Sequence, residues 1–184
     1  MIPPRTMNVL EMQRLRMQMN HPGILPDMEL NLSQQLDRAR DTGDVLIWSH
    51  LLLAGASVEI DAGNAEIAAE YLNEYKEIVS GLAAADTRPA IEKMLKARLF
   101  VLQGDLRRAE EQAEESLSFL RGIGHENDSP HIAQANAVLG GIRCETGSLD
   151  DGRSLLNESL EYWRSIAGSA EGEQKMNHLA ASCL

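Results

Sequence analysis

The sequence predicts an all-α fold built from helical hairpins that stack on one another. Aromatic residues make up only 4% of the 184 residues and hydrophobic residues make up 43%, so Ala and Leu carry most of the core, as is usual in packed helices. Residues 95–120 have the pattern of two amphipathic helices that meet at a tight turn, Gly104-Asp105, and versions of this pattern recur on both sides. Because one such hairpin cannot bury its apolar face alone, it must stack on copies of itself.

Residues 1–43 are predicted to form N-terminal capping helices. Apolar residues between 6 and 20, several of them Met, follow the spacing of a short amphipathic helix that ends at His21-Pro22-Gly23. A second helix is predicted over about 28–40, with its end at Thr42-Gly43. The first helix is expected to cover the exposed end of the stack. The alternative is a detachable Met-rich segment that engages a partner or packs into a groove of this same chain.

Residues 44–168 are predicted to form three helical hairpins. Their six helices are expected at about 44–62, 64–80, 87–103, 105–121, 130–146 and 149–166. Capping signals support these boundaries, because Asp105 follows Gly104 and Ser129-Pro130 places an N-cap before a first-turn proline. A weaker helix over about 171–184 makes 169–184 a C-terminal capping helix or the start of a truncated repeat.

Three glycines at the predicted turns set the register of the repeat. Alignment on Gly63, Gly104 and Gly147 gives steps of 41 and 43 residues. Small residues then coincide seven positions before and five positions after each glycine, and these are Ala56, Ala97 and Gly140, and Ala68, Ala109 and Gly152. Small side chains permit short distances between helix axes, so these residues are predicted at the crossing of each hairpin. Nine positions after the glycines, Leu72, Ala113 and Leu156 are expected to face one common core.

This pattern resembles the tetratricopeptide repeat family over about 44–168. The likeness rests on the small residues of each hairpin, the Gly104-Asp105 turn, the Leu139-Gly140 pair, Phe100, and the helix ends at 120–124 and 163–168. The units are longer than the family's usual repeat of about 34 residues, like the extended repeats of large bacterial transcriptional activators and kinesin light chains. Glu59 and Arg143 replace the expected aromatic residue. The resemblance implies a right-handed superhelical α-solenoid whose first helices line a concave, peptide-binding groove.

The family's groove pattern selects twelve residues when it is carried onto this chain. They are His50, Leu53, Ser57 and Ile60 from the first hairpin, Ile91, Met94, Arg98 and Val101 from the second, and Gln134, Ala137, Gly141 and Cys144 from the third. This lining is largely apolar or neutral, with Arg98 as its main cation. It lacks the several Lys, Arg and Asn residues with which some relatives clamp a chaperone's terminal carboxylate. We therefore expect the groove to bind a helix or an apolar extended peptide, unless part of it is buried against another helix of this chain.

Composition and motifs disfavour several other functions. The net charge of -11 argues against nucleic acid and anionic membrane surfaces, and no segment approaches the roughly 18 uninterrupted apolar residues of a spanning helix. No nucleotide-binding or nucleophile motif is present, so we expect no catalysis and no cofactor. His125 and His131 flank a loop without further ligands, which favours a surface or cap role over a metal site. Two cysteines, Cys144 and Cys183, do not form a disulfide framework, which favours a reducing, cytoplasmic location.

Two acidic stripes accompany the second helices of the first two hairpins. They are Glu66, Glu70, Glu74 and Glu77, and Glu110, Glu111, Glu114 and Glu115. Such stripes are expected to be solvated faces, and the alternative is the docking of a basic partner.

The function expected from these observations is that of a non-catalytic scaffold or adaptor, which binds a protein or peptide partner in the concave groove. The alternative is a ligand-responsive regulatory module, a sensor in which a small inducer or peptide shifts the curvature of the stack. This second interpretation follows from the resemblance to transcriptional activators. A homodimer through exposed terminal helices is compatible with either function, since the ends of a repeat stack present apolar surface.

Overall fold

The structure, a computed structural model, describes residues 25–79, 87–123 and 129–166. These residues form seven α-helices and no strand, so the predicted all-α class is confirmed for the described part of the chain. The helices are α2 (Leu25–Thr42), α3 (Val45–Ala62), α4 (Ala65–Ile78), α5 (Arg88–Leu102), α6 (Leu106–Ile123), α7 (Ser129–Glu145) and α8 (Leu149–Ile166). From α3 onward each boundary lies within two residues of its predicted position. The helices predicted at 6–20 and 171–184 lie outside the described residues.

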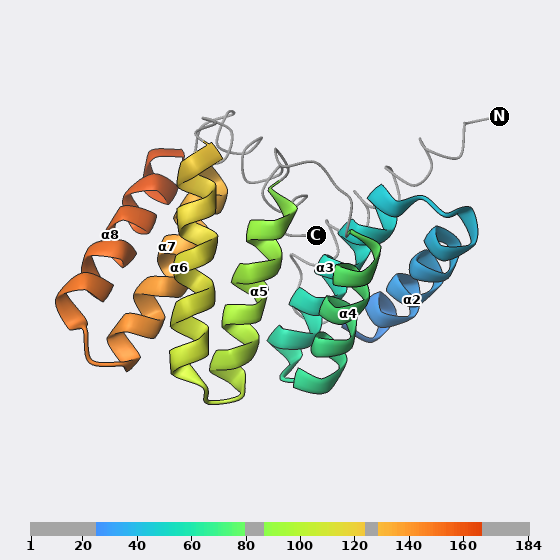
Figure 1. Cartoon of the computed structure of the whole chain (residues 1–184), viewed down its shortest axis with the longest axis horizontal. Helices are drawn as coiled ribbons and strands as arrows, with labels where there is room; N and C mark the ends of the chain where they lie inside the picture. The colour runs from blue at the N-terminus through green and yellow to red at the C-terminus, as the bar shows by residue number, and fades with distance from the viewer. Residues whose placement is uncertain (1–24, 80–86, 124–128, 167–184) are drawn as a thin grey trace.

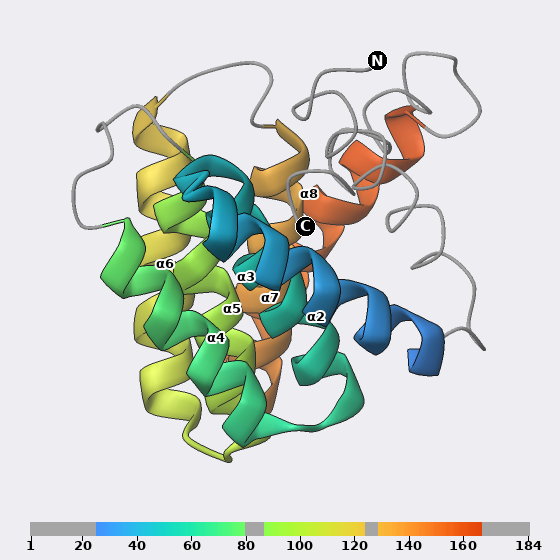
Figure 2. The same ribbon diagram turned by 90° about the vertical axis from the view of Figure 1, so that its right-hand side faces the viewer.

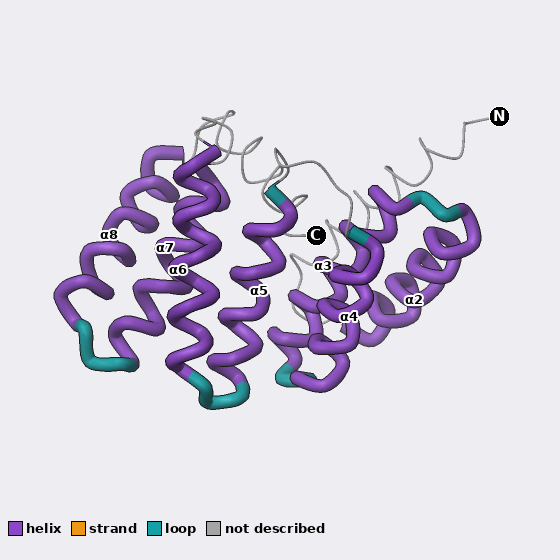
Figure 3. Tube along the Cα trace, viewed as in Figure 1, coloured by secondary structure: helices purple, strands orange, loops and turns teal. Residues whose placement is uncertain are grey.

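The helices α3 to α8 form three hairpins that follow one another along the longest axis of the molecule (Figures 1 and 3). Within each hairpin the two helices pack together, as α3 with α4, α5 with α6 and α7 with α8. Between hairpins, α3 packs on α5 and α5 on α7, while α4 contacts α5 and α6 contacts α7. The helix α2 packs on α3 at one end of this row, and α8 stands at the other end (Figure 1).

The three hairpin turns share one backbone geometry. Gly63, Gly104 and Gly147 have φ angles of 82°, 77° and 93°, in the left-handed region where only glycine is unstrained. Each glycine N–H donates to the carbonyl three residues back, and the following N–H donates to the carbonyl five residues back, with N···O distances of 2.8 to 3.3 Å. This hydrogen bonding satisfies the last carbonyls of the first helix and reverses the chain. The predicted repeat register is therefore visible in the backbone itself.

The small residues lie where each hairpin crosses, as the sequence predicts. Ala56, Ala68, Ala97 and Ala109 are fully buried. In the third hairpin a Cβ atom added to Gly140 would lie 2.9 Å from the carbonyl oxygen of Gly152, so the two backbones nearly touch. One part of the predicted core is wrong, because Leu72 and Ala113 are buried but Leu156 is 38% exposed. The reason is that Leu156 lies on α8, which has no further hairpin beyond it in the described residues.

The first hairpin contains the most apolar helix, α3. Every residue from Leu51 to Ile60 is buried, because α2, α4 and α5 pack around it. By length and composition α3 alone among the described helices is long and apolar enough to cross a membrane, and 61% of it is buried inside the molecule. A core helix meets the same criteria. Polar residues interrupt the apolar run of α3, so the criterion of about 18 uninterrupted apolar residues does not select it from the sequence.

Candidate functional site

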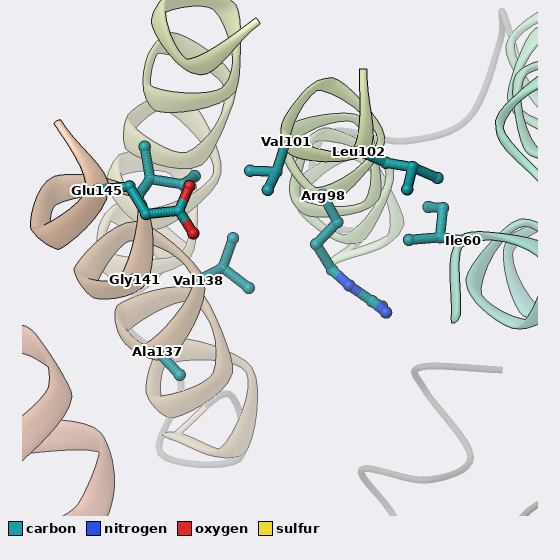
Figure 4. Close-up of a pocket in the computed structure, with 9 residues that line it drawn as sticks. Ile60, Arg98, Val101, Leu102, Ala137, Val138, Gly141 and Glu145 are labelled. Carbon is teal, nitrogen blue, oxygen red and sulfur yellow. The ribbon is translucent and has the colours of Figure 1, made fainter. Parts of the chain in front are cut away.

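An open pocket of about 360 Å³ lies between the first helices of the three hairpins (Figure 4). We call it the α3–α5–α7 pocket. Its lining consists of Ile60 from α3, Arg98, Val101 and Leu102 from α5, and Ala137, Val138, Gly141, Ile142 and Glu145 from α7. Most of these side chains are apolar, and all lie at the middle of their helices or later. The pocket therefore forms where the three first helices approach their turns.

Five of the twelve predicted groove residues line this pocket. They are Ile60, Arg98, Val101, Ala137 and Gly141. The pocket is also lined by four residues outside the predicted set, Leu102, Val138, Ile142 and Glu145. Three of these follow a predicted α7 position by one residue, while Ala137 and Gly141 also line the pocket, so the side of α7 that faces the pocket is broader than the predicted one.

Other predicted groove residues belong to the core instead. Leu53 is fully buried, Ile91 and Met94 are each 2% exposed, and Ser57 is 8% exposed. The reason is that α3, α5 and α7 pack directly on one another, so residues at their contacts are buried between the helices. A partner cannot reach these side chains in this arrangement. The available surface is narrower than the sequence predicts.

The remaining predicted positions lie apart from the pocket lining. The sulfur of Cys144 lies against Gly152, where an added Cβ would approach it to 2.6 Å, so Cys144 faces α8. His50 is half-buried, with Nδ1 2.8 Å from the carbonyl oxygen of Leu46 one turn earlier in α3. Gln134 is also half-buried. The structure thus brings together five of the twelve predicted residues, and Cys144, His50 and Gln134 lie outside the pocket.

Arg98 is held in place by α3. Its Nη1 atom donates to the hydroxyl of Ser57 at 3.2 Å, and its Nη2 atom forms an ion pair with Asp61. The Arg98 side chain is only 22% exposed, so these two contacts orient the guanidinium at the α3 side of the pocket. Glu145 is exposed and lies on the α7 wall (Figure 4). A cation and an anion therefore stand on different walls, with apolar residues between them.

The predicted acidic stripes are largely engaged within the molecule. Glu74 binds Arg40, Glu110 and Glu114 bind Arg143, Glu111 binds Arg107 and Glu115 binds Lys93. The pKa of Arg143 is raised, chiefly by its hydrogen bond to Glu114, so this guanidinium stays charged. Arg143 occupies a position where the repeat pattern leads one to expect an aromatic residue. Its ion pairs join α7 to α6.

The α3–α5–α7 pocket is mainly apolar. Its lining contains one cation, one anion and otherwise apolar side chains or glycine. Among the described residues, no group of three or more His, Cys, Asp or Glu is placed to hold a metal ion. His131, for which the sequence favoured a surface or cap role, is 3% exposed in α7. No family model matches the chain, and no curated protein matches it at a significant level.

Proposed function

We propose that this chain is a non-catalytic interaction module of the tetratricopeptide repeat type, a right-handed stack of hairpins that binds an apolar peptide or helix in the α3–α5–α7 pocket. The observation that carries the proposal is the composition of the pocket, since its walls come from the first helices of three successive hairpins. The repeated turn geometry and the packing of α3 on α5 and of α5 on α7 support the repeat assignment.

The chemistry of the lining defines the ligand. A volume of about 360 Å³ is at the small end of the range for ligand pockets, about 300–1,000 Å³. Such a site accepts a few apolar side chains of a peptide, as in helix-in-groove recognition, where residues spaced by three and four positions enter a groove. Arg98 already forms an ion pair with Asp61, whereas Glu145 favours a basic group at the α7 wall. The preferred peptide therefore carries apolar side chains with a basic group on the side that faces α7.

The test uses a glycine that opens the pocket. Nothing lies within 4 Å of a Cβ atom added to Gly141, so a side chain can start there, and Gly141→Trp is expected to place its indole in the pocket. Peptides selected from a random display library on the purified full chain are expected to bind Gly141→Trp at least about tenfold more weakly by fluorescence anisotropy, because the indole occupies their site. Gly122→Trp is the matched control, since Gly122 also has open space around its Cβ position but lies on α6 outside the pocket. Equal affinity for both variants contradicts the proposal.

A ligand-responsive regulatory module is the second candidate, and the same pocket favours it. A small apolar molecule bound there would contact three hairpins at once, so its binding energy could change how they pack. A ligand that binds only the folded chain raises the melting temperature. A thermal shift with a small molecule, lost in Gly141→Trp and absent with every selected peptide, would favour the sensor over the scaffold.

A further inference from the structure

The last helix, α8, carries a stripe of exposed leucines. Leu149, Leu156 and Leu160 are 62%, 38% and 43% exposed. Their spacings of seven and four residues place them on one face of the helix, and Trp163 continues the same face seven residues after Leu156. We call these four residues the α8 stripe. Because α8 stands at the end of the row of helices (Figures 1 and 2), the stripe is not part of the core.

The corresponding residues of the preceding hairpin are packed against a neighbouring helix. Alignment of Gly104 with Gly147 places Leu106, Ala113, Leu117 and Leu120 of α6 at the positions of the α8 stripe. Ala113, Leu117 and Leu120 are 4% exposed or less, because α5 and α7 cover α6. In this repeat the second helix of a hairpin packs against a further helix through these positions. The α8 stripe is the corresponding surface of the last hairpin. In the described residues α8 packs chiefly on α7, and the leucines of the stripe stay partly exposed.

The charged residues beside the stripe indicate which helix packs on it. Asp150, Arg153, Glu161 and Arg164 are exposed along the edge of α8 that adjoins the leucines. In the sequence, Asn157 lies midway between Asp150 and Arg164. It also lies midway between Arg153 and Glu161. An antiparallel α8 from another molecule, related by a two-fold axis at Asn157, thus brings each Asp150 level with Arg164 and each Arg153 level with Glu161. A parallel pair would instead place like charges side by side.

We propose that the α8 stripe is a self-association surface on which a second copy of this chain docks its own α8 in antiparallel orientation. Two-fold symmetry buries both stripes in one step, so the assembly closes as a dimer. One helix from each copy makes a small contact, at or below the range of about 1,200–2,000 Å² that is typical of stable interfaces. The dimer is therefore expected to dissociate in the micromolar range. No residue of the stripe lines the α3–α5–α7 pocket, so this proposal stands or falls independently of the proposed function.

The test is the mass of the full chain in solution as a function of concentration. Analytical ultracentrifugation from about 1 to 100 μM is expected to show a reversible shift from one copy of 20.3 kDa to two. Leu156→Glu is expected to give a single copy throughout, because it places a carboxylate at the centre of each stripe. Ser154→Glu is the matched control, since Ser154 is exposed on the side of α8 away from the stripe and its variant should still dimerise. Circular dichroism confirms that both variants remain folded.

The charge pairs test the antiparallel arrangement separately. Arg153→Glu is expected to weaken the dimer about tenfold or more, because it sets two carboxylates against each other on both sides of the axis. The double variant Arg153→Glu with Glu161→Arg is expected to restore the affinity, since the pair is then merely reversed. A wild-type chain that stays a single copy up to 100 μM overturns the proposal. The same holds if hydrogen exchange then shows that other residues of the same chain cover α8. A dimer that survives Leu156→Glu, or a reversed pair that does not restore affinity, also overturns it.

Discussion

At the scale of single residues, two adjacent glycines of α7 have different roles. A Cβ atom on Gly140 would lie 2.9 Å from the Gly152 carbonyl oxygen and 2.9 Å from Cγ of Leu156, whereas one on Gly141 would meet nothing within 4 Å. Gly140 therefore permits the crossing of α7 and α8, and Gly141 opens the pocket. The sequence register predicted the first role correctly, because the small residues at that position recur in all three hairpins. It placed Gly141 in the groove through the family resemblance alone.

The two glycines predict stability changes of opposite sign. Gly140→Ala is expected to lower the free energy of unfolding by about 1–3 kcal/mol, because its methyl group overpacks the contact with the Gly152 backbone and forces the two helices apart. Gly141→Ala is expected to raise it by up to about 1 kcal/mol, since alanine has the higher helix propensity and the site is open. Urea unfolding followed by circular dichroism measures both changes. Equal effects of the two substitutions would show that α7 and α8 do not cross at Gly140.

The Asp105 side chain caps α6 and predicts an acid-dependent stability. Its Oδ1 atom accepts the backbone N–H of Arg108 at 3.1 Å, and its Oδ2 atom binds the Arg108 side chain, whose guanidinium carbon lies 4.6 Å from the centroid of Phe100. The backbone hydrogen bond, and then the side-chain one, lower the pKa of Asp105 below its ordinary value. A folded-state pKa below the unfolded one stabilises the fold above the ordinary pKa of Asp, and this contribution is lost as the pH falls toward the lowered value.

Asp105→Asn keeps a capping side chain but removes this titration. Wild-type protein is therefore expected to lose more stability than Asp105→Asn between about pH 5 and pH 3, as measured by thermal melts at each pH. Parallel stability curves for the two proteins would mean that the cap does not contribute to acid sensitivity.

At the scale of elements, Glu74 of α4 joins three helices. Its carboxylate accepts two hydrogen bonds from Arg40 of α2, at 2.9 and 2.8 Å, and one from the indole Nε1 of Trp48 in α3 at 2.9 Å. The hydrogen bond to Glu74 is the main cause of the raised pKa of Arg40, so this guanidinium stays charged. A bidentate contact of this kind fixes orientation as well as distance. The position of α2 on the first hairpin therefore depends on one side chain of α4.

Glu74→Gln is expected to loosen α2 before any other helix. The side chains involved are partly exposed, with 41% for Arg40 and 26% for Glu74, so the cost in stability should be only about 1 kcal/mol. Hydrogen exchange should nevertheless accelerate at the amides of α2, because α2 packs chiefly on α3 and has few other contacts. Glu70→Gln, an exposed carboxylate one turn earlier on α4, serves as the control. Unchanged exchange in α2 after Glu74→Gln would show that apolar packing alone holds this helix.

At the scale of the whole molecule, local signals and tertiary packing differ in how far the sequence reveals them. Helix boundaries were predicted within two residues from α3 onward because Gly63, Gly104 and Gly147 impose a left-handed turn whatever surrounds them. The groove surface on the first helices was predicted less well. The rotation of each first helix within the stack decides whether Met94 is buried and whether Cys144 faces α8. No local pattern records that rotation. The exposed face of α8 likewise follows only from its place at the end of the row.

The same arrangement predicts that stability is distributed unevenly along the row. The helix α5 packs against α3, α4, α6 and α7, whereas α8 packs chiefly on α7. In a stack stabilised by contacts between neighbours, a central defect weakens every hairpin and a terminal defect frees only the end. Leu95 of α5 and Leu155 of α8 are 2% and 8% exposed, so they permit the same chemical change at both places.

Leu95→Ala is expected to lower the free energy of the whole unfolding transition by about 2–5 kcal/mol, because the cavity lies where three hairpins meet. Leu155→Ala is expected to accelerate hydrogen exchange mainly in α8, with slow exchange retained in α3 and α5, since α8 can detach while the remaining hairpins stay packed. Urea unfolding by circular dichroism and hydrogen exchange by mass spectrometry measure the two effects. If Leu155→Ala instead accelerates exchange equally in α3, α5 and α8, the chain unfolds as one indivisible core and the hairpins are not its units of stability.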